Sequence, residues 1–128
     1  TAESIYTRER STDVWDGNSQ TWDGKVGLLY PSDYMYASNV CYDGADSGNY
    51  KDDECVSTNW LMNNTVYWLL SPESIDQHAV LIARNDGTLY IAGVDSASDV
   101  NIRPTVYLNA DVKFVSGNGK STNPFIIK

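Results

Sequence analysis

Few residues of this chain have the types and spacing that catalysis requires. A nucleophile with its base needs serine or cysteine close to histidine, and the one histidine, His78, lies in a polar loop. Ser71 and Glu73 could place a hydroxyl beside a carboxylate, although Ser-Pro followed by Glu is also ordinary turn chemistry. Paired carboxylates for glycoside hydrolysis need an apolar pocket, which spacing alone does not show. The sequence therefore predicts no catalytic residue and a protein that is not an enzyme.

Acidic side chains gather in one polar segment. The carboxylates that could bind Ca²⁺ there are Asp43, Asp46, Asp52 and Asp53. Their order departs from the D-x-D-x-D-G calcium loop, because Gly44 and Ala45 occupy the early positions. We interpret the segment as a solvated loop, with weak Ca²⁺ binding as the alternative and no other cofactor.

Two cysteines, Cys41 and Cys55, flank this acidic segment. Neither belongs to a CxxC pair and the chain has one histidine, so a zinc site is disfavoured. We expect a disulfide, whose loop of about 15 residues would contribute on the order of 3 kcal/mol in the chain-entropy model. The alternative is two free thiols in a cytosolic protein. A disulfide predicts an oxidising compartment, such as the cell surface or the extracellular space.

Nine tyrosines and four tryptophans are more than packing requires. Aromatic faces suit sugar rings and protein partners because they offer large, rigid contact areas. The candidates for a ligand-binding surface, all in polar loops, are Trp15, Trp22, Tyr42 and Tyr50. The alternative is that these four side chains cover the sheet. The aromatic residues that we assign to the core or a sheet face are Trp60, Tyr67, Trp68, Tyr90 and Tyr107, and Arg103 is interpreted as a partly buried structural residue.

The elements that must position these residues centre on a β-rich stretch, residues 66–108. Apolar residues in 79–84 and 89–94 flank an Asn-Asp-Gly turn, which is the strongest hairpin signal in the chain. Further strands are predicted at 66–70, 102–108, 112–115 and 124–127, and short helices at 33–38 and 58–63. The predicted fold is α+β and mainly β: one domain over 1–128, a small antiparallel sheet, one or two short helices and long loops. Residues 1–10 are expected to form a leading strand or a tether.

Composition narrows the classes of partner. A net charge of −8 and a sequence pI of about 4.3 argue against nucleic acid and anionic lipid, because both need a basic face. No apolar run approaches the roughly 18 residues of a membrane span, so no direct membrane insertion is expected within this segment. Since the chain begins at Thr1 without methionine, we expect that a leader or an anchoring N-terminal segment has been removed.

Several motifs of the chain form a pattern when taken together: YTRER at 6–10, WDGKVGLLYPSDY at 22–34, NWL at 59–61, WLLSP at 68–72, RPTVYL at 103–108, SGNG at 116–119 and NP at 123–124. This pattern resembles an uncharacterised surface domain of Gram-positive bacteria (Bacilli and Clostridia). That family is often C-terminal in proteins with a prepilin-type leader, so the resemblance implies a pilin-like surface location and brings no activity. The WLLSP and IRPTV stretches are also distantly similar to strands of the C-type-lectin and formylglycine-generating-enzyme fold. The lectin sugar triplets are absent, so no calcium or sugar residue is carried over.

These observations predict an extracellular or cell-surface binding module without catalytic activity. It would be the head domain of a pilin-like protein and would contact a glycan or a protein through the loops between residues 11 and 57. The alternative is a structural surface or pilus subunit that associates with copies of itself and has no ligand. The two differ in a simple observable, because only the second predicts assembly that depends on concentration.

Overall fold

A computed structural model describes residues 1–11, 14–15, 18–19, 23–41, 50, 53–72, 76, 78–95 and 98–128. The fold is α+β, as predicted. In chain order the elements are α1 (Ala2–Glu9), β1 (Val14–Trp15), β2 (Asn18–Ser19), α2 (Pro31–Tyr36), α3 (Asp53–Ser57), β3 (Tyr67–Pro72), β4 (Ala79–Ala83), β5 (Leu89–Gly93), β6 (Phe114–Ser116) and β7 (Ile126–Ile127). No helix in these ranges is both long enough and apolar enough to cross a membrane.

The central sheet has the antiparallel order β3-β4-β5, and its hairpin is the one that the sequence predicts. Leu81 pairs with Ile91 and Ala83 with Leu89. The turn between them closes at Gly87, whose φ of 85° lies in the left-handed region that favours glycine. A Cβ atom at Gly87 would also clash with the side chain of Val56. The Asn-Asp-Gly signal is therefore confirmed.

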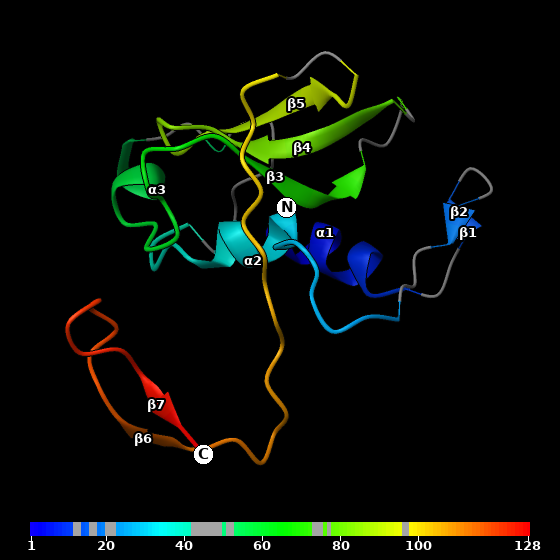
Figure 1. The fold of residues 1–128 in the computed structure, drawn as a ribbon. Helices are drawn as coiled ribbons and strands as arrows, with labels where there is room; N and C mark the ends of the chain where they lie inside the picture. The colour runs from blue at the N-terminus through cyan, green and yellow to red at the C-terminus, as the bar shows by residue number, and fades with distance from the viewer. Residues whose placement is uncertain are drawn as a thin grey trace.

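Helix α1 corrects the prediction of a leading strand or tether at residues 1–10. Thr1 is its N-cap: the hydroxyl accepts a hydrogen bond from the Ser4 amide, and the Ser4 hydroxyl accepts one from the Thr1 amino group over 3.0 Å. This reciprocal cap pairs N–H groups that a helix start otherwise leaves without a partner. The helix then packs against α2 below the sheet (Figure 1). The cap at the first residue is the signal that was overlooked.

The other two helices also differ from their predictions. Helix α2 begins at Pro31, a residue suited to the first helical turn, so Ser32 lies within the helix and is not its N-cap. The second predicted helix, at 58–63, is wrong, because the helix is α3 and residues 60–61 form a turn. Leu61 points inward as expected, whereas Trp60 is 75% exposed.

The predicted strand at 102–108 is an extended passage with two isolated bridges. Asn101 pairs with Tyr67 and Thr105 with Gly27, so the backbone of this stretch is bridged to the body at two residues. Arg103 between them has the structural role that the sequence predicts. Its Nη1 donates to the Leu61 carbonyl over 2.6 Å and to the Tyr67 hydroxyl over 3.2 Å.

The core lies between the sheet and the helices and is rich in tyrosine. Tyr34, Tyr50 and Tyr67 are all at most 1% exposed, and the Tyr34 ring centroid lies 5.7 Å from that of Tyr50 and 6.3 Å from that of Tyr67. The Tyr34 hydroxyl donates to the Gly87 carbonyl over 2.7 Å. Because buried hydroxyls need partners, this bond fixes α2 against the turn of the hairpin.

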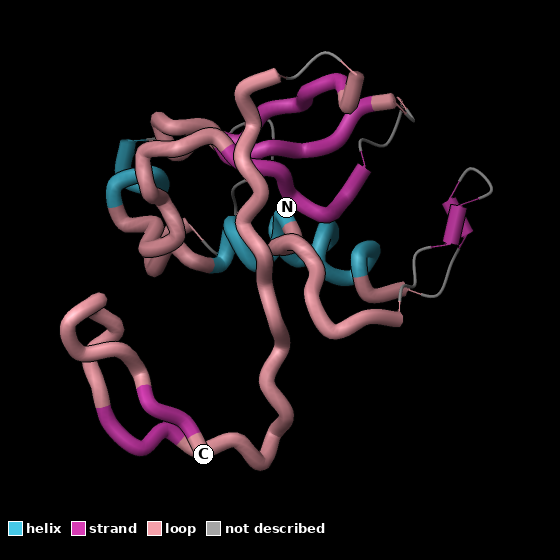
Figure 2. The backbone as a smooth tube through the Cα atoms, in the orientation of Figure 1, coloured by secondary structure: helices cyan, strands magenta, loops and turns pink. Residues whose placement is uncertain are grey.

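After Tyr107, whose hydroxyl still bonds to Asp33 in α2, the chain leaves this body. Figures 1 and 2 show an extended linker that ends in the β6–β7 hairpin, well apart from the sheet and the helices. We call residues 106–128 the C-terminal arm. None of its residues is buried, and only Val112 and Gly117 are partly buried. The strands predicted near the C-terminus are present as β6 and β7, but they extend no sheet of the body.

Candidate functional site

The structure describes the side chain of one of the four aromatic residues predicted to bind a ligand. Tyr50 is fully buried, so it offers no surface to a ligand. Trp15 lies in β1, but its side chain is outside the described part of the chain, as are Trp22 and Tyr42 entirely. For those three residues the ligand-binding surface stays a prediction.

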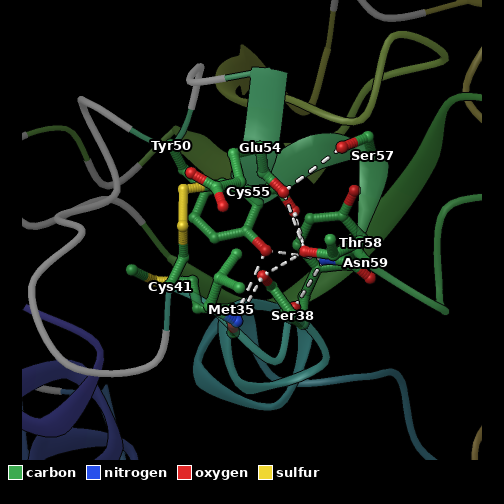
Figure 3. Close-up of a disulfide and its surroundings, with 11 residues drawn as sticks. Met35, Ser38, Cys41, Tyr50, Glu54, Cys55, Ser57, Thr58 and Asn59 are labelled. Carbon is green, nitrogen blue, oxygen red and sulfur yellow. Dashed lines mark hydrogen bonds between the residues drawn. A yellow bond between two sulfur atoms is a disulfide. The ribbon is translucent and has the colours of Figure 1, made fainter.

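Tyr50 belongs to a polar cluster inside the core, next to the disulfide (Figure 3). Asn59 Nδ2 donates to the Tyr50 hydroxyl and to the Tyr34 carbonyl, both over 2.8 Å. Asn59 Oδ1 in turn accepts the Leu61 amide over 2.9 Å. Burial raises the pKa of Tyr50, which keeps the phenol neutral. These contacts make Tyr50 a structural residue.

The disulfide between Cys41 and Cys55 is present, as predicted. Cys55 is 2% exposed and begins the inward face of α3, while Cys41 is partly buried on the core edge. Figure 3 shows the bridge beside Tyr50. The bridge therefore fastens α3 to the segment after α2.

The predicted calcium residues fall mostly outside the structure's description. Asp43, Asp46 and Asp52 are outside it, and Asp53 is described only as the start of α3. Among the described residues there is no group of three or more side chains that could hold a metal ion. Weak Ca²⁺ binding by this loop stays a prediction.

A buried carboxylate, Glu9, was missed by the sequence analysis. Its Oε1 accepts hydrogen bonds of 3.2 Å from the Ser32 amide and from the Ser71 hydroxyl, and its Oε2 accepts from the Ser32 hydroxyl. Burial raises the pKa of Glu9, while these hydrogen bonds and the nearby Arg10 guanidinium lower it by less. Ser71 thus meets the carboxylate of Glu9 in α1, whereas the predicted partner Glu73 lies outside the described residues.

This Glu9 cluster joins three elements and continues to the arm. Arg10 Nη1 contacts Glu9 over 3.3 Å, and its Nη2 contacts Asp33 over 2.9 Å. The hydroxyl of Tyr107 donates to Asp33 over 2.7 Å, and both burial and the Asp33 carboxylate raise the pKa of Tyr107. Asp33 therefore holds the first residues of the arm against α2.

The arrangement around Glu9 holds structure together and offers no reaction. The Glu9 side chain is only 4% exposed, so a substrate could not reach it. The described partners are two serines and an arginine, and His78 is exposed, with its Nδ1 3.6 Å from Asp76. A serine nucleophile would need a base that can release and return its proton in an open site, and this cluster has neither access nor a histidine.

Most of the large apolar side chains of the C-terminal arm are exposed. Those of the hairpin and linker are Val106 (55%), Tyr107 (65%), Leu108 (57%), Phe114 (64%), Val115 (55%), Phe125 (62%), Ile126 (54%) and Ile127 (47%). Single exposed apolar residues are normal on a protein surface, but a contiguous group marks an interaction site. The arm is therefore a candidate interaction surface.

Comparison with known protein families, with curated proteins and with solved structures finds no match. The resemblances to the Gram-positive surface domain and to the lectin-like fold accordingly stay predictions from sequence motifs.

Sequence reasoning found the residues of the arm but not their exposure. The strands at 112–115 and 124–127 were predicted because they are short runs rich in β-branched and aromatic residues on either side of a turn with two glycines. Nothing local in such a pattern says whether the apolar face meets the chain's own core. The nearest signal was the pair of glycines in 116–120, which predicts a self-contained hairpin.

Proposed function

We propose that this chain is a non-catalytic extracellular structural module whose copies associate through the C-terminal arm. The observation that carries the proposal is the arm itself, in which eight large apolar side chains are each at least 47% exposed. Burial of apolar surface is worth about 25 cal/mol per Å², so leaving this surface in water is costly. An assembly of copies would remove that cost.

The disulfide supports the extracellular part of the proposal. Disulfides persist in oxidising compartments and are rare in the reducing cytosol, and here the bridge joins the loop between α2 and α3 to the core. The prepilin-type resemblance points to the same location. In this compartment the arm would be free to meet other copies of the module at a cell surface.

A glycan-binding role through the aromatic loops is the other candidate from the sequence. Of its four aromatic residues, the one whose side chain is described, Tyr50, is buried. No contact among the described residues favours a sugar site over the arm. Binding of a glycan array that is lost on Trp15→Ala and Trp22→Ala would restore that candidate.

The proposal is tested by sedimentation equilibrium over a wide range of protein concentration. The wild type is expected to associate, and the double variant Phe114→Ser/Phe125→Ser to remain a monomer at the same concentrations. The control is Tyr90→Ser, which removes another half-exposed aromatic ring, 59% exposed on the body. Association by the control but not by the arm variant supports the proposal, whereas a wild type that is monomeric throughout would overturn it.

A further inference from the structure

An apolar groove lies where the arm leaves the body. It is lined by Val26, Gly27, Leu28, Leu70, Ile102 and Pro104 and has a volume of about 390 Å³. Two of its lining side chains are strongly exposed, Val26 at 52% and Ile102 at 72%. The backbone bridge of Gly27 to Thr105 forms part of its frame. A cavity of this size and lining suits apolar side chains better than a polar ligand.

The β6–β7 hairpin is held together by its own contacts, and its apolar side chains are exposed. Phe114 pairs across the strands with Ile127, and the Phe114 and Phe125 rings pack edge to face with centroids 5.9 Å apart. At the turn Gly117 has a φ of 103°, and a Cβ there would clash with the Pro124 carbonyl. A two-stranded hairpin on its own is only marginally stable in water. Its apolar side chains therefore need a surface to pack on.

The linker directs the hairpin away from the groove of its own chain. Ile102 and Pro104 border that groove, and the Tyr107 hydroxyl is held by Asp33 just beyond them. The next residues run extended to the hairpin (Figure 1), and residues 106–113 at full extension span roughly 26 Å. The hairpin would have to double back to reach its own groove, whereas the groove of a second copy can meet it directly.

Charge favours the same pairing. The arm holds three lysines and one aspartate, a net charge of +2. Residues 1–105 hold six basic and sixteen acidic residues, a net charge of −10, which with the arm gives the −8 of the whole chain. Opposite net charges attract the arm of one copy to the body of another and disfavour contact between two bodies.

We propose that the β6–β7 hairpin of one copy docks into the groove of a second copy, with the exchange reciprocated across a two-fold axis. The exposed fractions of Phe114, Phe125, Ile126 and Ile127 correspond to roughly 400 Å² of apolar side chain per arm, at about 200 Å² for an aromatic residue. Two arms together bring roughly 800 Å² of apolar side chain to the two contacts, from the same exposed fractions. The inference rests on the proposed function and names its docking site.

Reciprocal exchange makes a prediction that other modes of association do not share. An arm variant, Phe114→Ser/Phe125→Ser, keeps an intact groove, and a groove variant, Val26→Asp/Ile102→Asp, keeps an intact arm. The four positions are all more than half exposed, so both proteins are expected to fold. Each alone lacks both contacts of the dimer, but a mixture regains one of the two.

The experiment is native mass spectrometry and sedimentation velocity on each variant and on their mixture, with one variant labelled with ¹⁵N. We expect each variant to dimerise about a hundredfold more weakly than the wild type, as for loss of central apolar contacts. The mixture is expected to form a heterodimer, and Tyr90→Asp to dimerise like the wild type. Unchanged circular dichroism and melting temperature verify that the variants fold.

Each other outcome has a distinct meaning. If the arm variant is monomeric but the groove variant dimerises like the wild type, the groove is not the docking site and the proposed function stands. If both variants are monomeric and the mixture gives no heterodimer, reciprocal exchange is contradicted. If the wild type is itself monomeric at every concentration, the proposed function fails as well, and the hairpin packs on its own chain or on another protein.

Discussion

The body and the arm contain similar apolar residues, but these side chains are buried in the core of the body and exposed in the arm. In the body Leu69 is 2% exposed and Tyr67 is 1% exposed, and the Tyr67 hydroxyl donates to the Leu61 carbonyl. In the arm Leu108 is 57% exposed and Tyr107 is 65% exposed. The body therefore completes its own core. The arm carries residues of the same types, and in this structure their side chains stay exposed.

The largest expected effect comes from the same substitution made in each region. Leu69→Ala should lower the free energy of unfolding by about 2–5 kcal/mol, because it opens a cavity in a packed core. Leu108→Ala, measured where the chain is monomeric, should change it by less than about 0.5 kcal/mol. Urea unfolding followed by tryptophan fluorescence gives both values. Equal losses at the two positions would show that the arm packs on its own body.

The disulfide should matter to the body alone. Cys41→Ser/Cys55→Ser frees a loop with a sequence separation of 14, which should lower the free energy of unfolding by about 3 kcal/mol. Association per folded molecule should not change, since neither cysteine belongs to the arm or lines the groove. The matched control is reduced wild-type protein with blocked thiols, which should lose a similar amount. A loss of association without a loss of stability would contradict this division of roles.

A substitution at the turn of the β6–β7 hairpin should affect the arm and leave the body unchanged. Gly117→Ala places a side chain where φ is positive and where the Pro124 carbonyl already lies, so the hairpin should open. Amide shifts of β6 and β7 should move toward disordered values while those of the central sheet stay unchanged. Asn118→Ala at the same turn is the milder control. Melting of the body by Gly117→Ala would show that the two regions are one cooperative unit.

The smallest expected effect is a pH-dependent change in stability from Glu9. Its cluster joins the body to the arm through Arg10 and Asp33. Burial raises the pKa of Glu9 above its ordinary value of 4.5. Between 4.5 and that raised pKa the folded chain binds more protons than the unfolded chain, so this group adds stability as the pH falls through the window. Glu9→Gln lacks the titration. Melting temperatures should therefore show the wild type gaining on the variant as the pH is lowered from neutral, and parallel curves would refute the assignment.

Features that depend on residues close together in the sequence could be predicted, whereas contacts between distant residues could not. The hairpin of β4 and β5 was predictable because the Asn-Asp-Gly turn and its flanking strands are local. The disulfide was predictable because only two cysteines exist. Helix α1 was missed although its cap at Thr1 and Ser4 is local, since an eight-residue helix leaves little periodicity.

Long-range placement could not be predicted in the same way. Glu9 meets Ser32 and Ser71, which lie 23 and 62 residues away, and no spacing in the sequence indicates that meeting. Tyr50 sits in a polar segment yet is buried, because Asn59 and Met35 surround its hydroxyl from two other segments. The exposure of the arm is the same kind of fact, since strand patterns do not state what covers a strand.

Hydrogen exchange at two protein concentrations tests the central claim most directly. Amides of β4 and β5 should be protected at both concentrations, because the body completes its own sheet. Amides of β6 and β7 should exchange rapidly in dilute protein and become protected in concentrated protein, as arms find their partners. Protection of the hairpin equal to that of the central sheet in dilute protein, or no gain at high concentration, would contradict the account.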